Sequence, residues 1–256
     1  MSYQLRQHGP HGVTTVVFPH LQVPHGFSTR LGGVSQGSFS ALNLGWLTTD
    51  EREAVSENQA RFDEHVGFAA RPTLRMEHGV EVAVVERPLE DRMVGDACTT
   101  DNPEVGLSLT TADCVPIFYH DPANRAVALA HAGWRGTVAG VALTTLQTMQ
   151  KHYRTRPEEV KVAIAPAIGP CCFEVDADVA GPFEGRFPGE DLVVSAGTKW
   201  RINLWRANWL LLVRSGVRPD NIVVGDLCTA CRQDLFFSYR RDRGHTGRMV
   251  AAILPG

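Results

Sequence analysis

Long apolar runs and a strong net charge are both absent from this 256-residue sequence. The longest candidate apolar run, near Trp209 to Val213, is far too short to cross a bilayer, which takes about 20 residues of helix. The polar segment 1–10 also lacks the apolar stretch of a secretory signal peptide. The formal charge of −3 gives no electrostatic reason to bind nucleic acid or an anionic membrane. We therefore expect a cytoplasmic protein with neither partner, in which any anion site is built from a local group of arginines.

Internal repeats, low-complexity segments and linker-like runs of Pro, Gly and Ser are absent as well. The 43% share of hydrophobic residues is enough for a substantial core in a chain of this length. We expect one domain over residues 1–256. Strand patterns and helical patterns are interspersed without a regular βα alternation. This favours a mixed α+β fold with mixed or antiparallel sheets flanked by helices.

Hydrophobic patterning predicts the positions of the main elements. Apolar and β-branched runs predict strands at residues 13–18, 80–85, 115–119, 125–130, 160–165, 221–224 and 249–254. Helical spacing predicts helices before Gly67, from 137 to about 153, and near 203–215. At the start of the first helix, Thr48 and Glu51 have the spacing of a capping box, and Asp50 is a rival cap.

Two chemically reactive side chains stand where predicted strands meet turns. Cys114 follows Asp113, a charge that is costly to bury without a partner. His131 follows the apolar run 126–130 and precedes a glycine-rich turn. A free thiol is often just a small buried apolar residue, and a lone histidine in such a place is often a hydrogen-bonded core residue. Their positions at strand boundaries favour a functional site instead.

His78, which is followed by Gly79, is a third candidate. It adjoins a predicted strand that can orient its ring, although this weak criterion does not by itself separate it from His25. If His78, Cys114 and His131 converge, they form an N2S set with one open tetrahedral position, as in catalytic zinc sites. A metal-free nucleophile–base pair of Cys114 and His131 is the other chemistry that these residues allow. Their wide spacing matches no short zinc motif and does not decide between the two.

Two arginine-bearing turns are candidate anion sites. Arg135 lies just before a predicted helix that begins near Thr137, and the free N–H groups and positive dipole end of a helix attract anions. Arg30 lies in the loop 28–33, whose glycine amides could join it in holding phosphate. A turn with a solvated arginine is the alternative there. The C-terminal arginines, at positions 240, 241, 243 and 248, are interpreted as a solvated basic edge.

The six cysteines do not predict disulfides, because a chain of this length without a secretion signal is expected to keep its thiols reduced. Cys171 and Cys172 form an unusual adjacent pair, and Cys228 and Cys231 form a lone C-x2-C. The C-x2-C could be half of a structural zinc site, a redox pair or two core thiols, and the adjacent pair could in principle complete a four-thiolate site. No feature of the sequence brings the pairs together, so we interpret them as two core pairs.

Missing histidine motifs exclude two familiar kinds of metal site. The ten histidines include no His-x-His, the pairing that multicopper oxidases commonly use, so a four-copper centre is excluded. One copper ion can still occupy a Cys/His site adventitiously, because copper outcompetes zinc for such ligands. The sequence also has neither H-x-E nor P-C-x-x-C, which disfavours a standard zinc cytidine or adenosine deaminase.

A series of motifs, in order along nearly the whole chain, carries a family resemblance. They are residues 27–33 (FSTRLGG), 43–45 (NLG), 78–79 (HG), 111–116 (TADCVP), 131–136 (HAGWRG), 169–175 (GPCCFEV) and 236–242 (FFSYRRD). The sequence resembles the bacterial laccase-domain family, also called the multicopper polyphenol oxidase family. That family is better described as purine nucleoside phosphorylases with mixed deaminase activity. The resemblance implies a single mixed α+β domain and zinc at His78, Cys114 and His131.

The resemblance also implies a reaction, in which phosphate attacks ribose C1′ of a purine nucleoside and the base leaves. The expected substrates are inorganic phosphate with adenosine, inosine or S-methyl-5′-thioadenosine, and adenosine deamination is the expected side reaction. We expect catalytic roles for Asp113, Cys114 and Arg135. Arg30, Asn43 and Arg135 are expected to bind substrate or phosphate.

Two departures from the family pattern lie beside the expected site and bear on substrate preference. Met76-Glu77 stands where the family usually has Gln-Val, and residues 46–50 replace a histidine-containing segment. Two other hypotheses stay open. In the first, Cys114 and His131 are nucleophile and base of a metal-free hydrolase or amidase acting on peptidoglycan precursors, a role linked to relatives. In the second, the protein is a non-catalytic nucleotide-binding module.

Overall fold

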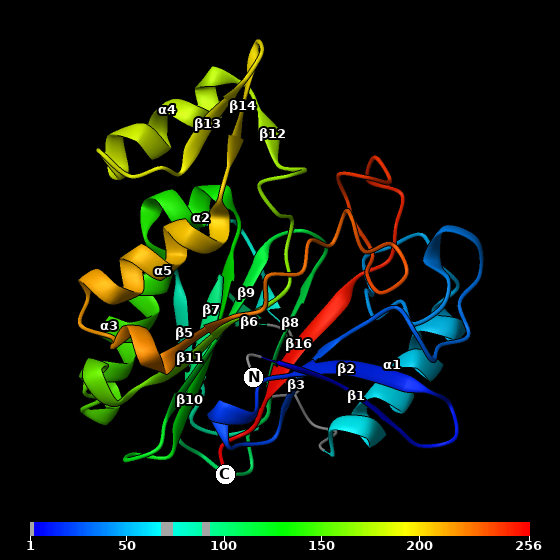
Figure 1. The fold of residues 1–256 in the computed structure, drawn as a ribbon. Coiled ribbons are helices and arrows are strands. Elements are labelled where there is room, and N and C mark those ends of the chain that lie inside the picture. Colours follow the sequence, from blue (N-terminus) through cyan, green and yellow to red (C-terminus); the bar gives the residue numbers. More distant parts are fainter. Residues whose placement is uncertain (1–2, 68–73, 89–92) are drawn as a thin grey trace.

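A computed structural model describes residues 3–67, 74–88 and 93–256, and their fold is of the mixed α+β class that the sequence predicts (Figure 1). Two large sheets, of six and five strands, share a core between their facing sides. Helices pack on the outer side of each sheet, so the layers follow the order helix, sheet, sheet, helix.

The six-stranded sheet contains the strands that position the site. Its order is β15 (Ile222–Val224), β11 (Lys161–Ile164), β9 (Val115–Asp121), β10 (Ala126–Ala132), β7 (Ala97–Thr100) and β5 (Val82–Val84). The four inner strands pair antiparallel, and the edge strands pair parallel to their neighbours. Every residue of β9 and β10 is buried, because successive side chains enter the cores on opposite faces. Ile117 and Tyr119 pack toward the helices, whereas Phe118 packs toward the second sheet.

The second sheet is antiparallel throughout. Its order is β1 (Gln4–His8), β2 (Val13–Val17), β3 (His25–Ser28), β16 (Met249–Ile253) and β8 (Leu107–Thr111). Phe27, Leu109 and Met249 pack into the core shared with the six-stranded sheet. On the other face, Val250 packs with Phe62 of helix α1 (Arg52–Val66), and this burial fixes the helix against the sheet.

Helices α3 (Val141–Tyr153) and α5 (Leu204–Arg214) cover the outer face of the six-stranded sheet, and the short helix α2 (Trp134–Ala139) joins β10 to α3. Helix α4 (Ala177–Arg186) and an antiparallel sheet project beyond α2 (Figure 1). The strands of that sheet are β12 (Glu174–Val175), β14 (Lys199–Ile202) and β13 (Val193–Ala196). The smallest elements are the pair β4 (Leu74–Arg75) and β6 (Met93–Val94), and 3-10 turns at Pro19–Leu21, Gly37–Phe39, Pro157–Glu159 and Pro219–Asn221.

The sequence predicts one helix from 137 to about 153, but the structure has two. Helix α2 begins earlier, at Trp134, and ends at Gly140, from which α3 starts. Gly140 has φ +97°, a left-handed conformation that ends a helix and that glycine adopts at little steric cost. The predicted strands, and the helix near 203–215, are present with ends that differ by two residues or fewer.

The expected capping of the first helix is wrong. Helix α1 begins after Glu51, and no side chain caps it. Thr48 and Asp50 instead accept hydrogen bonds from the side-chain amide of Asn43, each at 2.9 Å. Their polar groups therefore order the loop before the helix rather than its first turn.

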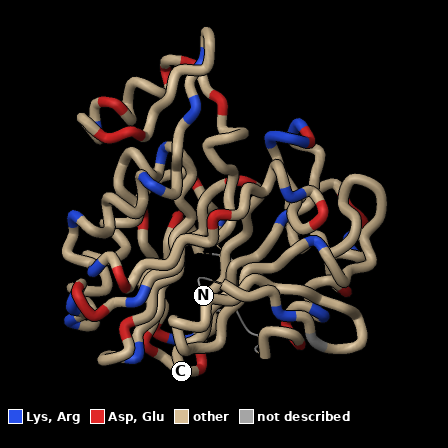
Figure 2. The backbone as a smooth tube through the Cα atoms, in the orientation of Figure 1, with Lys and Arg blue, Asp and Glu red and all other residues tan. Residues whose placement is uncertain are grey.

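No helix in the described part of the chain is both long and apolar enough to cross a membrane. Acidic and basic residues are interspersed along the backbone (Figure 2). This mixture agrees with the small formal charge of −3. Any attraction for anions must therefore come from local arrangements of side chains.

Candidate metal and substrate site

His78, Cys114 and His131 lie together at one end of the six-stranded sheet. Strand β10 pairs with β9 so that His131 lies opposite Pro116, which brings Cys114 to the level of Gly133. His78 lies in the turn between β4 and β5 and has a left-handed φ of +59°. One donor atom from each of the three residues lies within 4.8 Å of the others, and the two imidazole centroids are 5.0 Å apart.

This set of donors fits a zinc ion. Two imidazoles and a thiolate are ordinary zinc ligands, and three protein ligands leave one tetrahedral position for water or substrate. His131 is buried, Cys114 is half-buried and His78 is exposed, so the group is accessible from one side. A Cβ atom on Gly133 would lie 2.9 Å from Nδ1 of His78 and 3.2 Å from Sγ of Cys114. Glycine at this position therefore keeps the space between the ligands open.

Asp96, which is not among the site residues predicted from the sequence, organises two of the three candidate ligands. Its carboxylate accepts hydrogen bonds from the backbone N–H groups of Glu77, His78 and Gly79, at 3.1, 2.9 and 2.7 Å. Its Oδ1 also lies 3.0 Å from Nδ1 of His131, which leaves Nε2 of that ring for a metal. A carboxylate behind a ligand histidine fixes the orientation and tautomer of the ring. No local sequence signal marks Asp96, because its role arises from the pairing of β7 with β10.

The surroundings of Cys114 and His131 favour a thiolate and an imidazolium in the metal-free protein. Burial favours the neutral thiol, but the charges and hydrogen bonds of His131 and His78 outweigh it and lower the pKa of Cys114 to about 6. Burial likewise opposes the charged imidazole, but the Cys114 thiolate and the Asp96 carboxylate raise the pKa of His131 to about 9. Both charged forms therefore coexist around neutral pH.

We expect iodoacetamide to alkylate Cys114 of the metal-free protein with a midpoint near pH 6, because the rate rises as the thiolate forms. An ordinary cysteine has a midpoint at about pH 8.5. Peptide mapping after timed alkylation over a pH series measures this. His131→Gln should raise the midpoint by removing the cationic partner, and saturating zinc should protect the thiol. A wild-type midpoint no lower than that of an ordinary cysteine would contradict the ion pair.

Asp113 fixes the turn that presents Cys114. Its carboxylate accepts hydrogen bonds from the hydroxyls of Thr229 and Ser238, at 2.6 and 3.0 Å, and from the backbone N–H of Arg240, at 2.7 Å. Its φ of +91° is a strained conformation for a residue other than glycine. These three bonds offset the strain and tie the Cys114 turn to the C-terminal loop.

A cavity of about 470 Å³ opens beside the three candidate ligands. Trp134, Ile168 and Phe173 give it apolar and aromatic walls, while Arg240 and Arg248 add positive charge. Its volume falls within the range of roughly 300–1,000 Å³ that is typical of small-molecule sites. The cavity therefore suits a ligand with a flat apolar part and an anionic part.

The two cavity arginines belong to the segment interpreted from sequence as a solvated basic edge; Arg240 is indeed exposed, whereas Arg248 is half-buried, and both line the cavity. The guanidinium of Arg240 donates to the Glu174 carbonyl at 2.5 Å and lies over the Phe173 ring. Arg248 is half-buried, and its guanidinium lies over the Tyr239 ring. Arg248 directly precedes β16, so the strand-boundary criterion applied to Cys114 would have identified it.

Arg30 lies away from this cavity. Its guanidinium donates to the carbonyls of Ser40 and Gln233, at 2.6 and 3.2 Å, and lies over the ring of Phe237. It borders a separate hollow that also includes Arg241. The structure therefore does not bring Arg30 together with the Cys114 and His131 side chains.

Asn43 and Arg135 border the site indirectly. Asn43 is buried, and its Oδ1 accepts a hydrogen bond at 2.9 Å from the backbone N–H of Arg248, one of the cavity arginines. Arg135 is exposed, and its guanidinium lies 4.3 Å from the centroid of the Trp134 ring, which lines the cavity. Neither side chain is among the cavity-lining residues of the described chain.

The interpretation of the other cysteines as two core pairs is wrong. Cys171 and Cys231 are exposed, Cys172 is half-buried, and only Cys228 of this group is buried. The four sulfur atoms lie within 4.8 Å of one another and so form a second cluster of metal-ligating side chains. This group is apart from the cluster that contains Cys114.

The fold and the site together define a mixed α+β protein with a Cys/His cluster that lines a cavity of the size of a small-molecule site. A family model described as multi-copper polyphenol oxidoreductase laccase matches residues 24–255. The chain belongs to this family, which confirms the resemblance seen in the motifs.

Two curated relatives carry the name purine nucleoside phosphorylase. YlmD of Geobacillus stearothermophilus is 38% identical over 244 residues, covering 89% of this chain and 88% of the relative. A purine nucleoside phosphorylase of Deinococcus radiodurans is 39% identical over 247 residues, covering 94% and 93%. The crystal structure of Geobacillus stearothermophilus YlmD superposes with a TM-score of 0.91 at 34% identity, covering 99% of this chain and 98% of the other.

Proposed function

We propose that this chain is a single-domain, cytoplasmic, zinc-dependent purine nucleoside phosphorylase. Its substrates are inorganic phosphate and adenosine, inosine or S-methyl-5′-thioadenosine, and adenosine deamination is a side activity of the same site. One observation carries the proposal: a three-ligand Cys/His group faces a cavity of about 470 Å³ with aromatic walls and two arginines. The names of the relatives support the choice of reaction.

The reaction exchanges one bond of the nucleoside for another. An oxygen of phosphate attacks ribose C1′, the bond from C1′ to the purine nitrogen breaks, and the electron pair of that bond leaves with the base, which takes up a proton. The products are the free purine and the sugar 1-phosphate, which is ribose 1-phosphate from adenosine or inosine and S-methyl-5-thioribose 1-phosphate from S-methyl-5′-thioadenosine. Binding both reactants in one cavity supplies proximity and orientation, which account for a large part of the rate in such displacements.

His78, Cys114 and His131 hold the metal in this proposal, with zinc as the resident ion and copper as an adventitious one. The chemistry that a bound zinc ion supplies is Lewis acidity, which polarises an oxygen or lowers the pKa of water. The protein keeps the ligands in place through Asp96, whose carboxylate orients the His131 ring and the backbone of His78.

We propose Arg240 and Arg248 as the phosphate-binding residues, in place of Arg30 and Arg135. Both line the cavity, and each guanidinium is held over an aromatic ring with donors left for an anion. Burial lowers the pKa of Arg248, but the nearby Asp113 carboxylate and Cys114 thiolate favour its charged form.

Asn43 and Asp113 act as positioning residues in this proposal. Each accepts a hydrogen bond from the backbone N–H of one cavity arginine: Asn43 from Arg248 and Asp113 from Arg240. Both carboxylate oxygens of Asp113 are already engaged, which favours positioning over proton transfer.

A phosphorolysis assay tests the function. Zinc-loaded protein is expected to form the corresponding sugar 1-phosphate from each nucleoside only when phosphate is present, and Cys114→Ser should reduce the rate to near background. Arg248→Gln should raise the KM for phosphate more than the KM for nucleoside, because it removes a charged partner of the anion. Absence of a sugar 1-phosphate with all three nucleosides, from folded and metal-loaded protein, would refute the proposal.

A metal-free hydrolase or amidase acting on peptidoglycan precursors is the second candidate. The positions of three side chains favour it. Cys114 lies beside His131, and His131 lies beside Asp96, which is the arrangement of a nucleophile, its base and a carboxylate that orients the base. Removal of metal separates the two proposals. The hydrolase would keep its activity after treatment with a chelator, whereas the phosphorylase would lose it and recover it when zinc is returned.

A further inference from the structure

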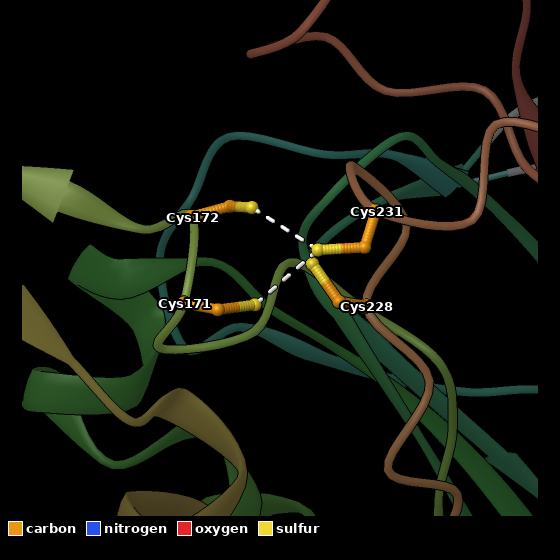
Figure 3. A group of neighbouring side chains, drawn as sticks. All are labelled: Cys171, Cys172, Cys228 and Cys231. Carbon is orange, nitrogen blue, oxygen red and sulfur yellow. Dashed lines mark hydrogen bonds between the residues drawn. The ribbon is translucent and has the colours of Figure 1, made fainter.

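Four cysteines from two distant parts of the chain meet in one cluster (Figure 3). Cys171 and Cys172 lie in the turn before β12, and Cys228 and Cys231 lie in the loop after β15. The Sγ atom of Cys231 lies 3.5 Å from that of Cys171 and 3.4 Å from that of Cys172. All four side chains point toward a common centre (Figure 3).

The spacing of the sulfur atoms matches a single tetrahedral ion. Zinc–sulfur bonds of about 2.3 Å in a tetrahedron place the sulfur atoms about 3.8 Å apart. The sulfurs here lie within 4.8 Å of one another, and two of the pairs, at 3.4 and 3.5 Å, are somewhat tighter than the ideal. A disulfide would need about 2.05 Å between two sulfurs, and all four of these cysteines are free thiols.

The backbone around the cluster holds the sulfurs in place. The N–H of Gly169 donates to Sγ of Cys228 at 3.2 Å, and the N–H of Cys172 donates to the Gly169 carbonyl at 3.0 Å. A Cβ atom on Gly169 would lie 3.1 Å from Cβ of Cys228 and 3.2 Å from Sγ of Cys171, so glycine permits the two turns to approach. A guanidinium nitrogen of Arg241 donates to the Thr229 carbonyl within the C-x2-C turn, which brings positive charge near the sulfurs.

We propose that Cys171, Cys172, Cys228 and Cys231 bind one zinc ion in a four-thiolate structural site. Four protein ligands fill the tetrahedron and leave no position for substrate, so this ion does not take part in the chemistry. A C-x2-C turn joined by two further cysteines is a common form of such sites. The inference concerns this second cluster alone and does not rest on the proposed function.

The position of the four-cysteine cluster means that a zinc ion bound there would help to shape the cavity. Ile168 and Phe173, on either side of the first cysteine pair, line the cavity. Thr229, between the second pair, donates its hydroxyl hydrogen bond to Asp113, which in turn holds the backbone of Arg240. One ion bound to both cysteine pairs would therefore connect the apolar wall formed by Ile168 and Phe173 to the wall that contains Arg240.

Metal content per chain tests the inference. Wild-type protein, purified under reducing conditions and equilibrated with zinc, is expected to hold two zinc ions after gel filtration. Cys171→Ser with Cys231→Ser should hold one, and His78→Ala should also hold one. The Cys98→Ala variant should still hold two zinc ions, because Cys98 is buried in the core between the two large sheets and belongs to neither cluster.

Cobalt substitution of the His78→Ala protein gives a second readout that leaves the cysteine cluster intact. We expect strong thiolate-to-cobalt absorption and the visible bands of a tetrahedral ion, and we expect alkylating reagents to spare all four cysteines until the metal is removed. The inference fails if wild-type protein holds a single zinc ion that the double serine variant retains. It also fails if the non-reduced protein is lighter by the mass of two or four hydrogens, which would indicate disulfides.

Discussion

Replacing Gly133 with alanine is expected to displace metal from the group of His78, Cys114 and His131 and to lower kcat/KM for phosphorolysis about 100-fold. Gly133 has φ −66°, which alanine adopts without strain, so the backbone is not the cause. The added methyl group would lie 2.9 Å from Nδ1 of His78 and 3.2 Å from Sγ of Cys114, closer than an unstrained contact of about 3.5–4.0 Å. The ligands must therefore move apart, and a displacement of about 1 Å at a catalytic centre can lower the rate about 100-fold.

Gly181→Ala is the matched control for this prediction. A Cβ atom at Gly181, on helix α4, would meet no atom within 4 Å, and alanine is favoured in helices. This variant should keep wild-type metal content and activity. A folded Gly133→Ala protein with unchanged zinc content and kcat/KM would show that the three residues do not surround a metal.

Asp96→Asn is expected to weaken zinc binding by about 10- to 100-fold, the usual effect of losing a carboxylate behind a ligand histidine. Oδ1 accepts from His78 and faces His131, while Oδ2 accepts from Glu77 and Gly79. Whichever way the asparagine amide is turned, its NH2 group faces at least one N–H donor. Leaving such donors unsatisfied also lowers the free energy of unfolding by about 1–3 kcal/mol each. Competition with a chromophoric chelator measures the affinity, and thermal unfolding of the metal-free protein measures the stability.

Asp121→Asn controls for the loss of a buried carboxylate elsewhere. Asp121 is fully buried, and its carboxylate accepts hydrogen bonds from the backbone N–H groups of Ala123 and Asn124 in the turn after β9. This variant should lose stability while keeping wild-type zinc affinity. If the substitutions at Asp96 and Asp121 change stability alike and neither changes zinc affinity, Asp96 does not support a metal ligand.

The strands around the site could be predicted because their residues are buried on both faces. The apolar runs at 115–119 and 125–130 correspond to β9 and β10, whose residues are all buried. The Asp121 turn between them was also predictable, since its side chain caps the turn in the usual way of aspartate. The break at Gly140 was not, because the helical spacing continues across it and only the left-handed backbone of Gly140 ends the helix.

The candidate ligands were identifiable from residue type and strand boundaries, but the residues that support them were not. Asp96 faces His131 because β7 pairs with β10, a contact between segments far apart in the sequence. Arg248 reaches the cavity because β16 pairs with β8, so that Met249 lies opposite Thr111 near the Cys114 turn. Such pairings are set by the packing of two sheets, which composition and periodicity do not specify.

The cysteine cluster could not be predicted from the sequence for the same reason. Each pair, 171–172 and 228–231, is visible in the sequence, but a local pattern does not indicate which distant turn lies beside it. The structure joins them through a backbone bridge in which Ala167 lies opposite Cys228. Gly169 then lets the two turns approach closely.

Anomalous diffraction at the zinc edge, from crystals of zinc-equilibrated wild-type protein, is the most direct measurement of the central claim. We predict a peak bounded by the donor atoms of His78, Cys114 and His131, about 2.0–2.1 Å from nitrogen and about 2.3 Å from sulfur, with its open side toward the cavity. Zinc bound elsewhere on the chain, with no peak among these three side chains, would contradict it.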